Sequence, residues 1–151
     1  MIGIVDYGMG NIKSVANGII RVGGEVKIVS QPNELQNCSA LVLPGVGAFA
    51  QAMENLNKAD LVNPIIERVE EDTPILGICL GMQLFAEYSE EFGVTKGLGL
   101  VEGGVVKIPE APGIRLPHMG WNEVKQVNSL DSSLFKDVPD EGCFYFVQNH
   151  R

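Results

Sequence analysis

A single cysteine stands between two glycines at the point where an apolar run ends. Residues 77 to 81 read Gly-Ile-Cys-Leu-Gly, with Cys79 at the centre. This spacing is typical of a nucleophile elbow, in which a strand turns sharply into a helix and the nucleophile adopts a strained backbone conformation. The glycines are needed because strand and helix pass very close together. We therefore predict that Cys79 is a catalytic nucleophile; the alternative is a buried structural cysteine at a strand end.

The segments around Cys79 also predict an oxyanion site. The positive end of a helix starting after Cys79 would favour a thiolate, and its backbone N–H groups, beginning with that of Leu80, can bind an oxyanion. A second glycine-rich turn at 44–49 also follows a predicted strand. Ligands collect at the carboxyl ends of strands in a doubly wound sheet, so Gly45, Val46 and Gly47 are candidate donors. An ordinary strand-to-helix turn is the alternative for this segment.

The remaining cysteines suggest no further chemistry. The chain has three cysteines, Cys38, Cys79 and Cys143, with no C-x-x-C spacing. An odd number in this arrangement indicates neither a disulfide framework nor a zinc site, so we expect no metal. Cys38 lies in a polar turn and Cys143 opens an aromatic strand, and both are expected to be inert packing residues.

The composition excludes several classes of partner. The 151 residues, 45% of them hydrophobic, suffice for one domain with a filled core, so we expect a single domain over 1–151. A net charge of −8, from 11 basic and 19 acidic side chains, offers no footprint for nucleic acid or an anionic membrane. The chain has no apolar stretch near the roughly 20 residues of a membrane span and no signal peptide at its N-terminus. We expect a cytoplasmic protein.

The apolar pattern predicts alternating strands and helices over the first 93 residues. Strands are predicted at 2–7, 25–30, 40–44 and 74–78, and helices at 11–24, 49–57, 61–72 and 80–92. Parallel strands need crossover helices on both faces, so this alternation predicts an α/β fold with a doubly wound, mostly parallel sheet. Residues 97–109, 123–127 and 142–151 are expected to be antiparallel additions at one edge, with a loop at 113–122.

Five segments together resemble a known enzyme family. They are "IVDYGMGN" (4–11), "LPGVGAF" (43–49), "ILGICLGMQLF" (75–85), "KGLGLVEG" (96–103) and "PHMGWNEV" (117–124). The chain is similar to class I (triad) glutamine amidotransferases, which have a flavodoxin-like core. Within that class it most resembles the glutaminase subunits of imidazole glycerol phosphate synthases of histidine biosynthesis. The resemblance extends over residues 1 to 147.

The resemblance implies glutamine hydrolysis without a cofactor. Cys79 would attack the side-chain carboxamide, release ammonia and leave a thioester for water to cleave. The oxyanion would lie between the N–H of Leu80 and the turn at 45–47. Gln83 matches a family glutamine that contacts substrate, and Glu91 matches an acidic residue near the substrate α-amino group. By themselves, Gln83 is equally well explained as a solvated helix position, and Glu91 better explained as part of an exposed acidic run.

A protein partner is also implied. The family passes ammonia through a sheltered tunnel to a synthase (cyclase) subunit, which predicts a heterodimer. Asn11 in "DYGMGN", and His118, Trp121 and Asn122 in "PHMGWN", correspond to its partner-facing loops. An exposed tryptophan is suited to anchor an interface. The alternative for Trp121 is a core residue.

One part of the family pattern is missing from the chain. A cysteine nucleophile needs a histidine base and a carboxylate that orients it. The family supplies both from a downstream His-Pro-Glu segment, whereas this chain has only His118, in a partner-facing loop, and His150, next to the last residue. We expect a C-terminally truncated form of a longer subunit rather than a short protein that has lost catalysis. The chain as it stands should hydrolyse glutamine poorly or not at all.

Two other functions stay open at this point. The ending "YFVQNHR" resembles the corresponding segment of the carbamoyl phosphate synthetase small subunit, so the ammonia acceptor can differ, for example a sugar. A non-catalytic binding module that retains the elbow pocket is the other alternative. Under that reading, the thiol of Cys79 is dispensable.

Overall fold

The computed structural model describes residues 1–109, 116–125, 138–139 and 141–150. The chain divides into two compact units, Met1–Val106 and Lys107–Arg151. Among the described helices, none is both long enough and apolar enough to cross a membrane.

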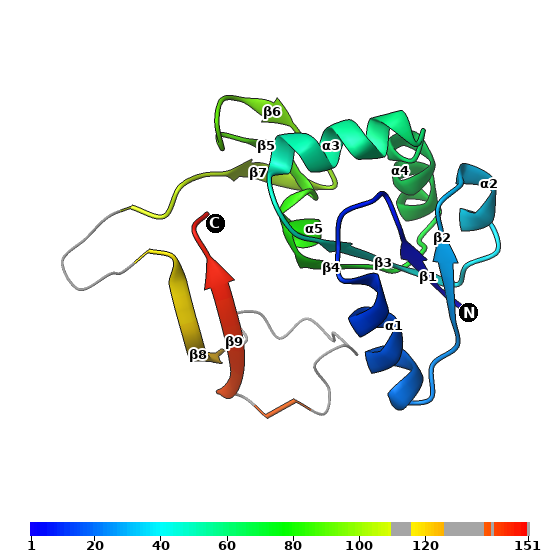
Figure 1. The fold of residues 1–151 in the computed structure, drawn as a ribbon, viewed down its shortest axis with the longest axis horizontal. Helices are drawn as coiled ribbons and strands as arrows, with labels where there is room; N and C mark the ends of the chain where they lie inside the picture. The colour runs from blue at the N-terminus through cyan, green and yellow to red at the C-terminus, as the bar shows by residue number, and fades with distance from the viewer. Residues whose placement is uncertain (110–115, 126–137, 140, 151) are drawn as a thin grey trace. The chain divides into compact units, whose positions relative to one another are not determined.

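A four-stranded parallel sheet forms the centre of the first unit (Figure 1). Its strands lie in the order β2-β1-β3-β4. Their bounds are Ile2–Val5 for β1, Val26–Val29 for β2, Ala40–Gly45 for β3 and Ile75–Cys79 for β4. Because neighbouring strands are parallel, their carboxyl ends lie at one edge of the sheet. At that edge Gly45 of β3 lies opposite Cys79 of β4.

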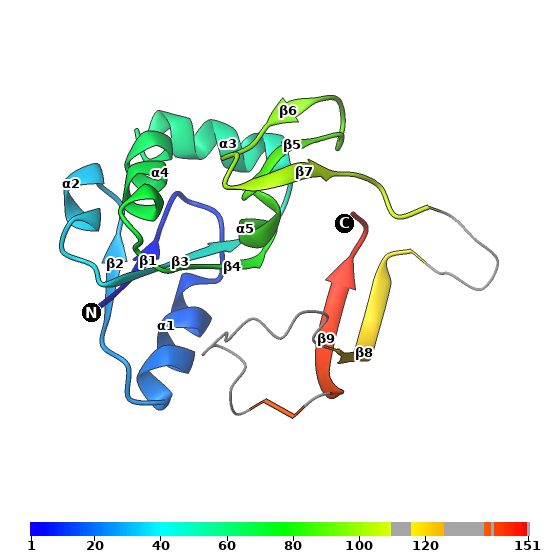
Figure 2. The ribbon, with the colours of Figure 1, turned by 180° about the vertical axis from the view of Figure 1, so that it is seen from behind.

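Helices cover both faces of this sheet. They are α1 (Ile12–Arg21), α2 (Pro32–Leu35), α3 (Phe49–Lys58) and α4 (Val62–Glu70). Figures 1 and 2 both show α1 on one face and α3 and α4 on the other. The main core lies on the α3 and α4 side, where the fully buried side chains include Val5, Leu43, Phe49, Leu56 and Ile65. The predicted doubly wound α/β fold is confirmed.

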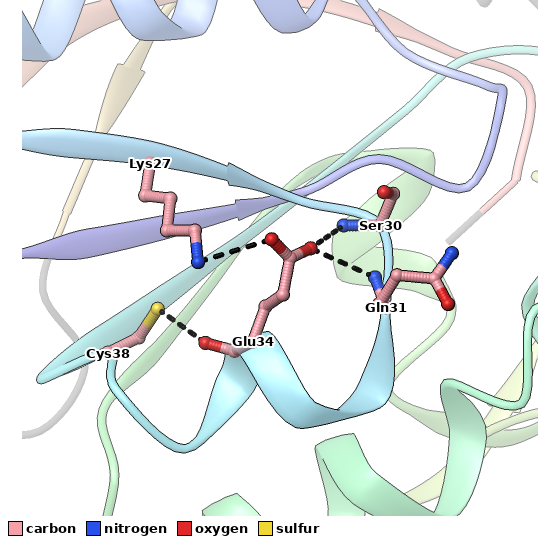
Figure 3. A network of polar contacts seen from close by, with 5 residues as sticks. All are labelled: Lys27, Ser30, Gln31, Glu34 and Cys38. Atoms are coloured by element: carbon pink, nitrogen blue, oxygen red, sulfur yellow. Dashed lines mark hydrogen bonds and ion pairs between the residues drawn. The ribbon is translucent and has the colours of Figure 1, made fainter.

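The connection between β2 and β3 contains a compact polar network (Figure 3). Glu34 Oε2 accepts hydrogen bonds from the backbone N–H groups of Ser30 at 3.0 Å and Gln31 at 3.2 Å. Lys27 Nζ lies 3.1 Å from Glu34 Oε1. The hydrogen bond from Ser30, followed by the contact with Lys27, holds the pKa of Glu34 below its usual value. The thiol of Cys38, which is 2% exposed, donates to the Glu34 carbonyl oxygen, so Cys38 is a packing residue as predicted.

The residues after Cys79 form a second, three-stranded sheet. Helix α5 (Leu80–Gln83) is a single turn, and β5 (Ala86–Ser89) follows it. Strand β5 pairs antiparallel with β6 (Thr95–Lys96) and parallel with β7 (Val101–Val105). The prediction of a helix over 80–92 is therefore wrong after the first turn. The prediction of an antiparallel addition at 97–109 is wrong for β7, which runs parallel to β5, whereas Lys107 forms the expected antiparallel bridge, with His150.

Pairing with the segments that follow it explains why β5 is a strand. Gly104 of β7 lies opposite Tyr88, and a Cβ atom at Gly104 would overlap the Tyr88 ring. The N–H of Gly97 donates to the carbonyl oxygen of Glu87 at 2.8 Å. The glycines let neighbouring segments approach β5 closely. The helical spacing of apolar residues is a local signal, and these tertiary contacts override it.

The second unit contains one antiparallel strand pair. Strand β8 (His118–Val124) pairs with β9 (Gly142–Gln148), with Trp121 opposite Tyr145. The antiparallel prediction for these segments is confirmed. The prediction of a loop is wrong for 118–122, because every residue from His118 to Val124 is in register with β9. The parts of these predictions at 113–115 and 126–127 lie outside the described residues.

Candidate active site

Cys79 has a strained backbone at the junction of β4 and α5. It is the last residue of β4 and the N-cap of α5, with φ of 56° and ψ of −119°. Non-glycine residues rarely adopt this region, and they persist there only when the surrounding structure holds them. Cys79 is exposed. The strand, the strained residue and the helix therefore occur in the order predicted for a nucleophile elbow.

The glycines on either side of Cys79 are sterically required. A Cβ atom at Gly77 would lie 2.5 Å from Met82 Cα. A Cβ atom at Gly81 would overlap the carbonyl oxygen of Leu43 on β3. Neither position can accept a side chain unless β3, β4 or α5 moves, which confirms the predicted reason for the Gly-x-Cys-x-Gly spacing.

The second glycine turn lies directly beside the elbow. A Cβ atom at Gly45 would lie 2.8 Å from the backbone nitrogen of Gly81 and 2.9 Å from Leu80 Cβ. Gly47 has φ of 91°, which favours glycine, and Val46 is half exposed. The structure thus brings the turn at 45–47 together with Cys79. Backbone atoms at the start of the turn therefore lie close to the elbow.

The helix after Cys79 is shorter than predicted. Because α5 contains four residues, its dipole is that of a single turn. Any stabilisation of negative charge at Cys79 must therefore rely on individual N–H groups rather than on a long helix. Gln83, the last residue of α5, is partly buried.

Glu91 is part of the framework around the second turn. Its Oε2 accepts a hydrogen bond of 2.8 Å from the N–H of Phe49, the first residue of α3. Its own N–H donates to Ser89 Oγ at 3.1 Å. Glu91 therefore anchors the start of the helix that follows the turn at 45–47, and it is not simply a member of a solvated acidic run.

The residues predicted to face a partner lie in both units. Asn11 is exposed and its Oδ1 accepts from the N–H of Ser14, which caps α1. On β8, Asn122 Nδ2 lies 2.9 Å from His118 Nε2. Trp121 is 72% exposed and meets the Tyr145 ring edge to face at 5.5 Å between centroids. Trp121 is therefore not a core residue.

Tyr7 is a site residue that the sequence analysis missed. Its ring is 5% exposed, and its hydroxyl donates to the carbonyl oxygen of Pro44 at 2.9 Å. Burial, and to a smaller extent the charge of Cys79, raise the pKa of Tyr7 to about 12. A signal was present, because Tyr7 follows a buried strand at the same sheet edge as Cys79, and a buried tyrosine hydroxyl needs a partner.

In the part of the chain that the structure describes, no three His, Cys, Asp or Glu side chains are grouped so that they could hold a metal ion.

Cys143 is exposed on β9, so its prediction as a packing residue is wrong. The side chains of this strand alternate between the two faces of a two-stranded ladder, which leaves Cys143 uncovered.

Sequence comparison connects the chain to one family. The family described as "Glutamine amidotransferase class-I" matches residues 3–151. The chain is 45% identical over 150 residues to "Imidazole glycerol phosphate synthase subunit HisH" of Desulfitobacterium hafniense, covering 99% of this chain and 69% of that protein. It is 49% identical over 154 residues to the protein of the same name from a Geobacillus species, covering 99% of this chain and 72% of the relative.

Solved structures agree in fold. One, described as a glutamine amidotransferase, has a TM-score of 0.66 and 23% identity over 81% of this chain, which spans 62% of that structure. A glutamine amidotransferase from Thermotoga maritima has a TM-score of 0.62 and 17% identity over 99% of this chain, which spans 60% of that structure. The chain thus covers less than two thirds of the length of these structures.

Proposed function

Because this chain belongs to the class-I glutamine amidotransferase family, we propose that it is the glutamine-hydrolysing subunit of an imidazole glycerol phosphate synthase. The observation that carries the proposal is the strained Cys79 between two sterically required glycines, beside Gly45. The names of the most similar relatives support histidine biosynthesis as the pathway that uses the ammonia. The cytoplasm is the proposed compartment.

In the proposed reaction, the Cys79 sulfur forms a bond to the side-chain carbonyl carbon of glutamine. The carbon–nitrogen bond then breaks as the nitrogen takes up the proton that the thiol has lost and leaves as ammonia. Water adds to the resulting thioester, the carbon–sulfur bond breaks, and glutamate is released. Backbone N–H groups of Leu80 and of the turn at 45–47 stabilise the oxyanion in both steps. Neither His118 nor His150 is assigned the role of the base.

Gln83 and Glu91 hold the amino-acid part of glutamine in this proposal. A carboxylate accepts hydrogen bonds on both oxygens, so Glu91 can bind the N–H of Phe49 and the substrate ammonium group together. Phe49 begins the helix that follows the turn at 45–47. Glu91 would therefore hold the substrate amino group close to that turn.

The ammonia acceptor is proposed to be a cyclase subunit. The contact residues proposed on β8 are Trp121 on one face of the strand and His118 and Asn122 on the other. Asn11, in the first unit, is proposed separately as a contact residue. The Trp121 ring is exposed in this chain, so a partner can bury it on binding. This supports the role, because aromatic side chains buried at an interface dominate the binding energy of many complexes.

Glutamine binding provides the test of the substrate. We expect calorimetry to detect binding of L-glutamine, but not D-glutamine, to the Cys79→Ala variant, which cannot form the thioester. We expect Glu91→Ala in that background to weaken binding at least about tenfold, because it removes a charged partner. Equal binding of the two enantiomers, or no binding of L-glutamine, would contradict the proposed substrate.

Sedimentation with a cyclase subunit provides the test of the partner. We expect Trp121→Ala to weaken the complex at least about tenfold, as for an aromatic interface anchor. Asn33→Ala, at an exposed position of α2, is the control and should leave the affinity unchanged. An unchanged affinity in the Trp121 variant would remove this residue from the interface.

A further inference from the structure

Tyr7 is a buried titratable residue that the reaction above does not use. It lies in the loop that leads from β1 to α1, and its hydroxyl donates to the second glycine turn. The hydroxyl donates to the Pro44 carbonyl oxygen, and a Cβ atom at Gly45 would lie 2.6 Å from the Tyr7 oxygen. The position of Tyr7 therefore depends on Gly45, and the turn is in direct contact with its hydroxyl.

Two more residues of the same loop contact this turn. Met9 Cε lies 2.9 Å from the place that a Cβ atom at Gly47 would occupy. A Cβ atom at Gly10 would lie 3.4 Å from the side chain and carbonyl oxygen of Pro44. The loop at 7–10 thus packs against both ends of the turn at 44–47. Of these three contacts, that of Tyr7 is a directional hydrogen bond, donated by a side chain to the backbone of the turn.

Gly45 ends β3 opposite Cys79, so pairing with β4 restrains the start of the turn, whereas Val46 and Gly47 lie beyond the strand. Gly45 and Gly47 lack side chains, and glycine has the widest choice of backbone conformations. The carbonyl oxygen of Pro44 and the N–H of Gly45 belong to one planar peptide group, so holding the oxygen fixes the direction of the N–H. A hydrogen bond from Tyr7 to that oxygen therefore sets the orientation in which the turn begins.

We propose that Tyr7 is a positioning residue for glutamine hydrolysis, whose hydroxyl holds the Pro44 carbonyl and so keeps the turn at 45–47 aimed at the oxyanion formed at Cys79. The inference rests on the proposed function, since it assumes an oxyanion at this place. Tyr7 acts through Pro44 and touches no substrate atom. Because its pKa is raised to about 12, the hydroxyl stays protonated, and so remains a donor, throughout the neutral pH range.

Two alkylating reagents separate the oxyanion turn from the reactivity of the thiol. In a glutamine analogue whose side-chain carboxamide is replaced by a chloromethyl ketone, the thiolate first adds to the ketone carbon and creates an oxyanion. The ketone then re-forms as this first carbon–sulfur bond breaks, while a new carbon–sulfur bond forms at the methylene carbon and chloride leaves. Iodoacetamide forms its carbon–sulfur bond by direct displacement of iodide, without an oxyanion. The rate constants of the ketone and of iodoacetamide at Cys79 are measured on the full chain by peptide mass spectrometry. Both depend on the reactivity of the thiol, so the ratio of the ketone rate to the iodoacetamide rate reports on the turn.

We expect Tyr7→Phe to lower this ratio about tenfold, less than the loss of a direct oxyanion donor, and to leave the iodoacetamide rate within about twofold of the wild type. Tyr88→Phe removes the same atom from a tyrosine on β5 and should change neither rate. An unchanged ratio in Tyr7→Phe, or an equal fall of both rates, would overturn the inference. If the wild-type chain shows no selective labelling of Cys79 by the ketone, the proposed function fails together with the inference.

Hydrogen exchange provides a second readout of the same turn. We expect the amides of 45–48 to exchange at least about tenfold faster in Tyr7→Phe than in the wild type, while amides of α4 exchange equally in both. Equal exchange at 45–48 would overturn the inference. If Tyr7→Phe alone does not fold, both measurements are made in a Gly18→Ala background, because a Cβ atom at Gly18 meets nothing within 4 Å and alanine favours the helix.

Discussion

At the scale of single residues, Cys79 combines exposure with backbone strain. Its positive φ and its ψ of −119° fall in a region that costs a non-glycine residue about 1–3 kcal/mol. The strand register of β4 and the close packing of Gly77 and Gly81 hold the residue there. This backbone conformation is unfavourable for a cysteine, and the tertiary structure maintains it. It places the exposed thiol at the carboxyl end of β4.

This strain predicts an unusual order of stability for two variants. Cys79→Gly should be about 1 kcal/mol more stable than Cys79→Ala, although glycine normally destabilises, because only glycine adopts this conformation without strain. Urea unfolding of the two variants measures the difference, and both lack the thiol. If the alanine variant were the more stable, the strained conformation at position 79 would be excluded.

The raised pKa of Tyr7 predicts an effect at high pH. The pKa rises from 10.0 to about 12 on folding, so the neutral form is favoured in the folded state. The resulting stability is fully present below pH 10 and is lost as the pH rises through 12. Between pH 9 and pH 11.5, the free energy of unfolding of the wild type should fall by about 2 kcal/mol relative to Tyr7→Phe. A constant difference between the two proteins would show that Tyr7 titrates normally.

At the scale of elements, the β4–α5 elbow depends on contact with β3. Gly81→Ala places a methyl group against the Leu43 carbonyl oxygen, so we expect a loss of about 2–3 kcal/mol in the free energy of unfolding. The matched control is Gly18→Ala in the open part of α1, which should gain about 0.5–1 kcal/mol. Chemical denaturation checks both. Similar effects at the two positions would mean that Gly81 is not packed against β3.

The start of α3 provides a second prediction at this scale. Glu91→Ala removes the acceptor of the Phe49 N–H and a negative charge at a helix N-terminus, and should cost about 1–2 kcal/mol of stability. Glu90→Ala, one residue earlier and exposed, should change stability by less than about 0.5 kcal/mol. Thermal and urea unfolding provide the measurement. A loss of glutamine binding in Glu91→Ala with no loss of stability would separate the two roles of this side chain.

The elements show which features were predictable from sequence. The four parallel strands and the helices α1, α3 and α4 follow local apolar patterns, and those patterns predicted them. Strand β5 did not, because it forms by pairing with β6 and β7, which lie outside the segment whose apolar spacing indicated a helix. The same distinction holds at the site. The Gly-x-Cys-x-Gly spacing is local and identified the elbow, whereas the contacts Tyr7–Pro44 and Glu91–Phe49 span 37 and 42 residues and have no local pattern.

At the scale of the whole molecule, the first unit contains the elbow, the second glycine turn, Gln83 and Glu91. The aromatic surface around Trp121 belongs to the second unit. Strand β4, which ends at Cys79, is the edge of the parallel sheet, and its side chains Leu76 and Ile78 are 42% and 37% exposed. An exposed apolar strand edge is a surface that other chain segments can cover. The chain spans 69% of its Desulfitobacterium relative.

The role of Cys79 as the nucleophile is tested by locating a glutamine-directed label on the chain. The full chain is treated with the glutamine chloromethyl ketone, with and without excess L-glutamine, and the modified cysteine is identified by peptide mass spectrometry. The account predicts modification of Cys79 that L-glutamine slows, with the exposed Cys143 left largely unmodified. Equal modification of Cys79 and Cys143, or labelling of Cys79 that L-glutamine does not affect, would contradict the assignment of Cys79 as the nucleophile of a glutamine site.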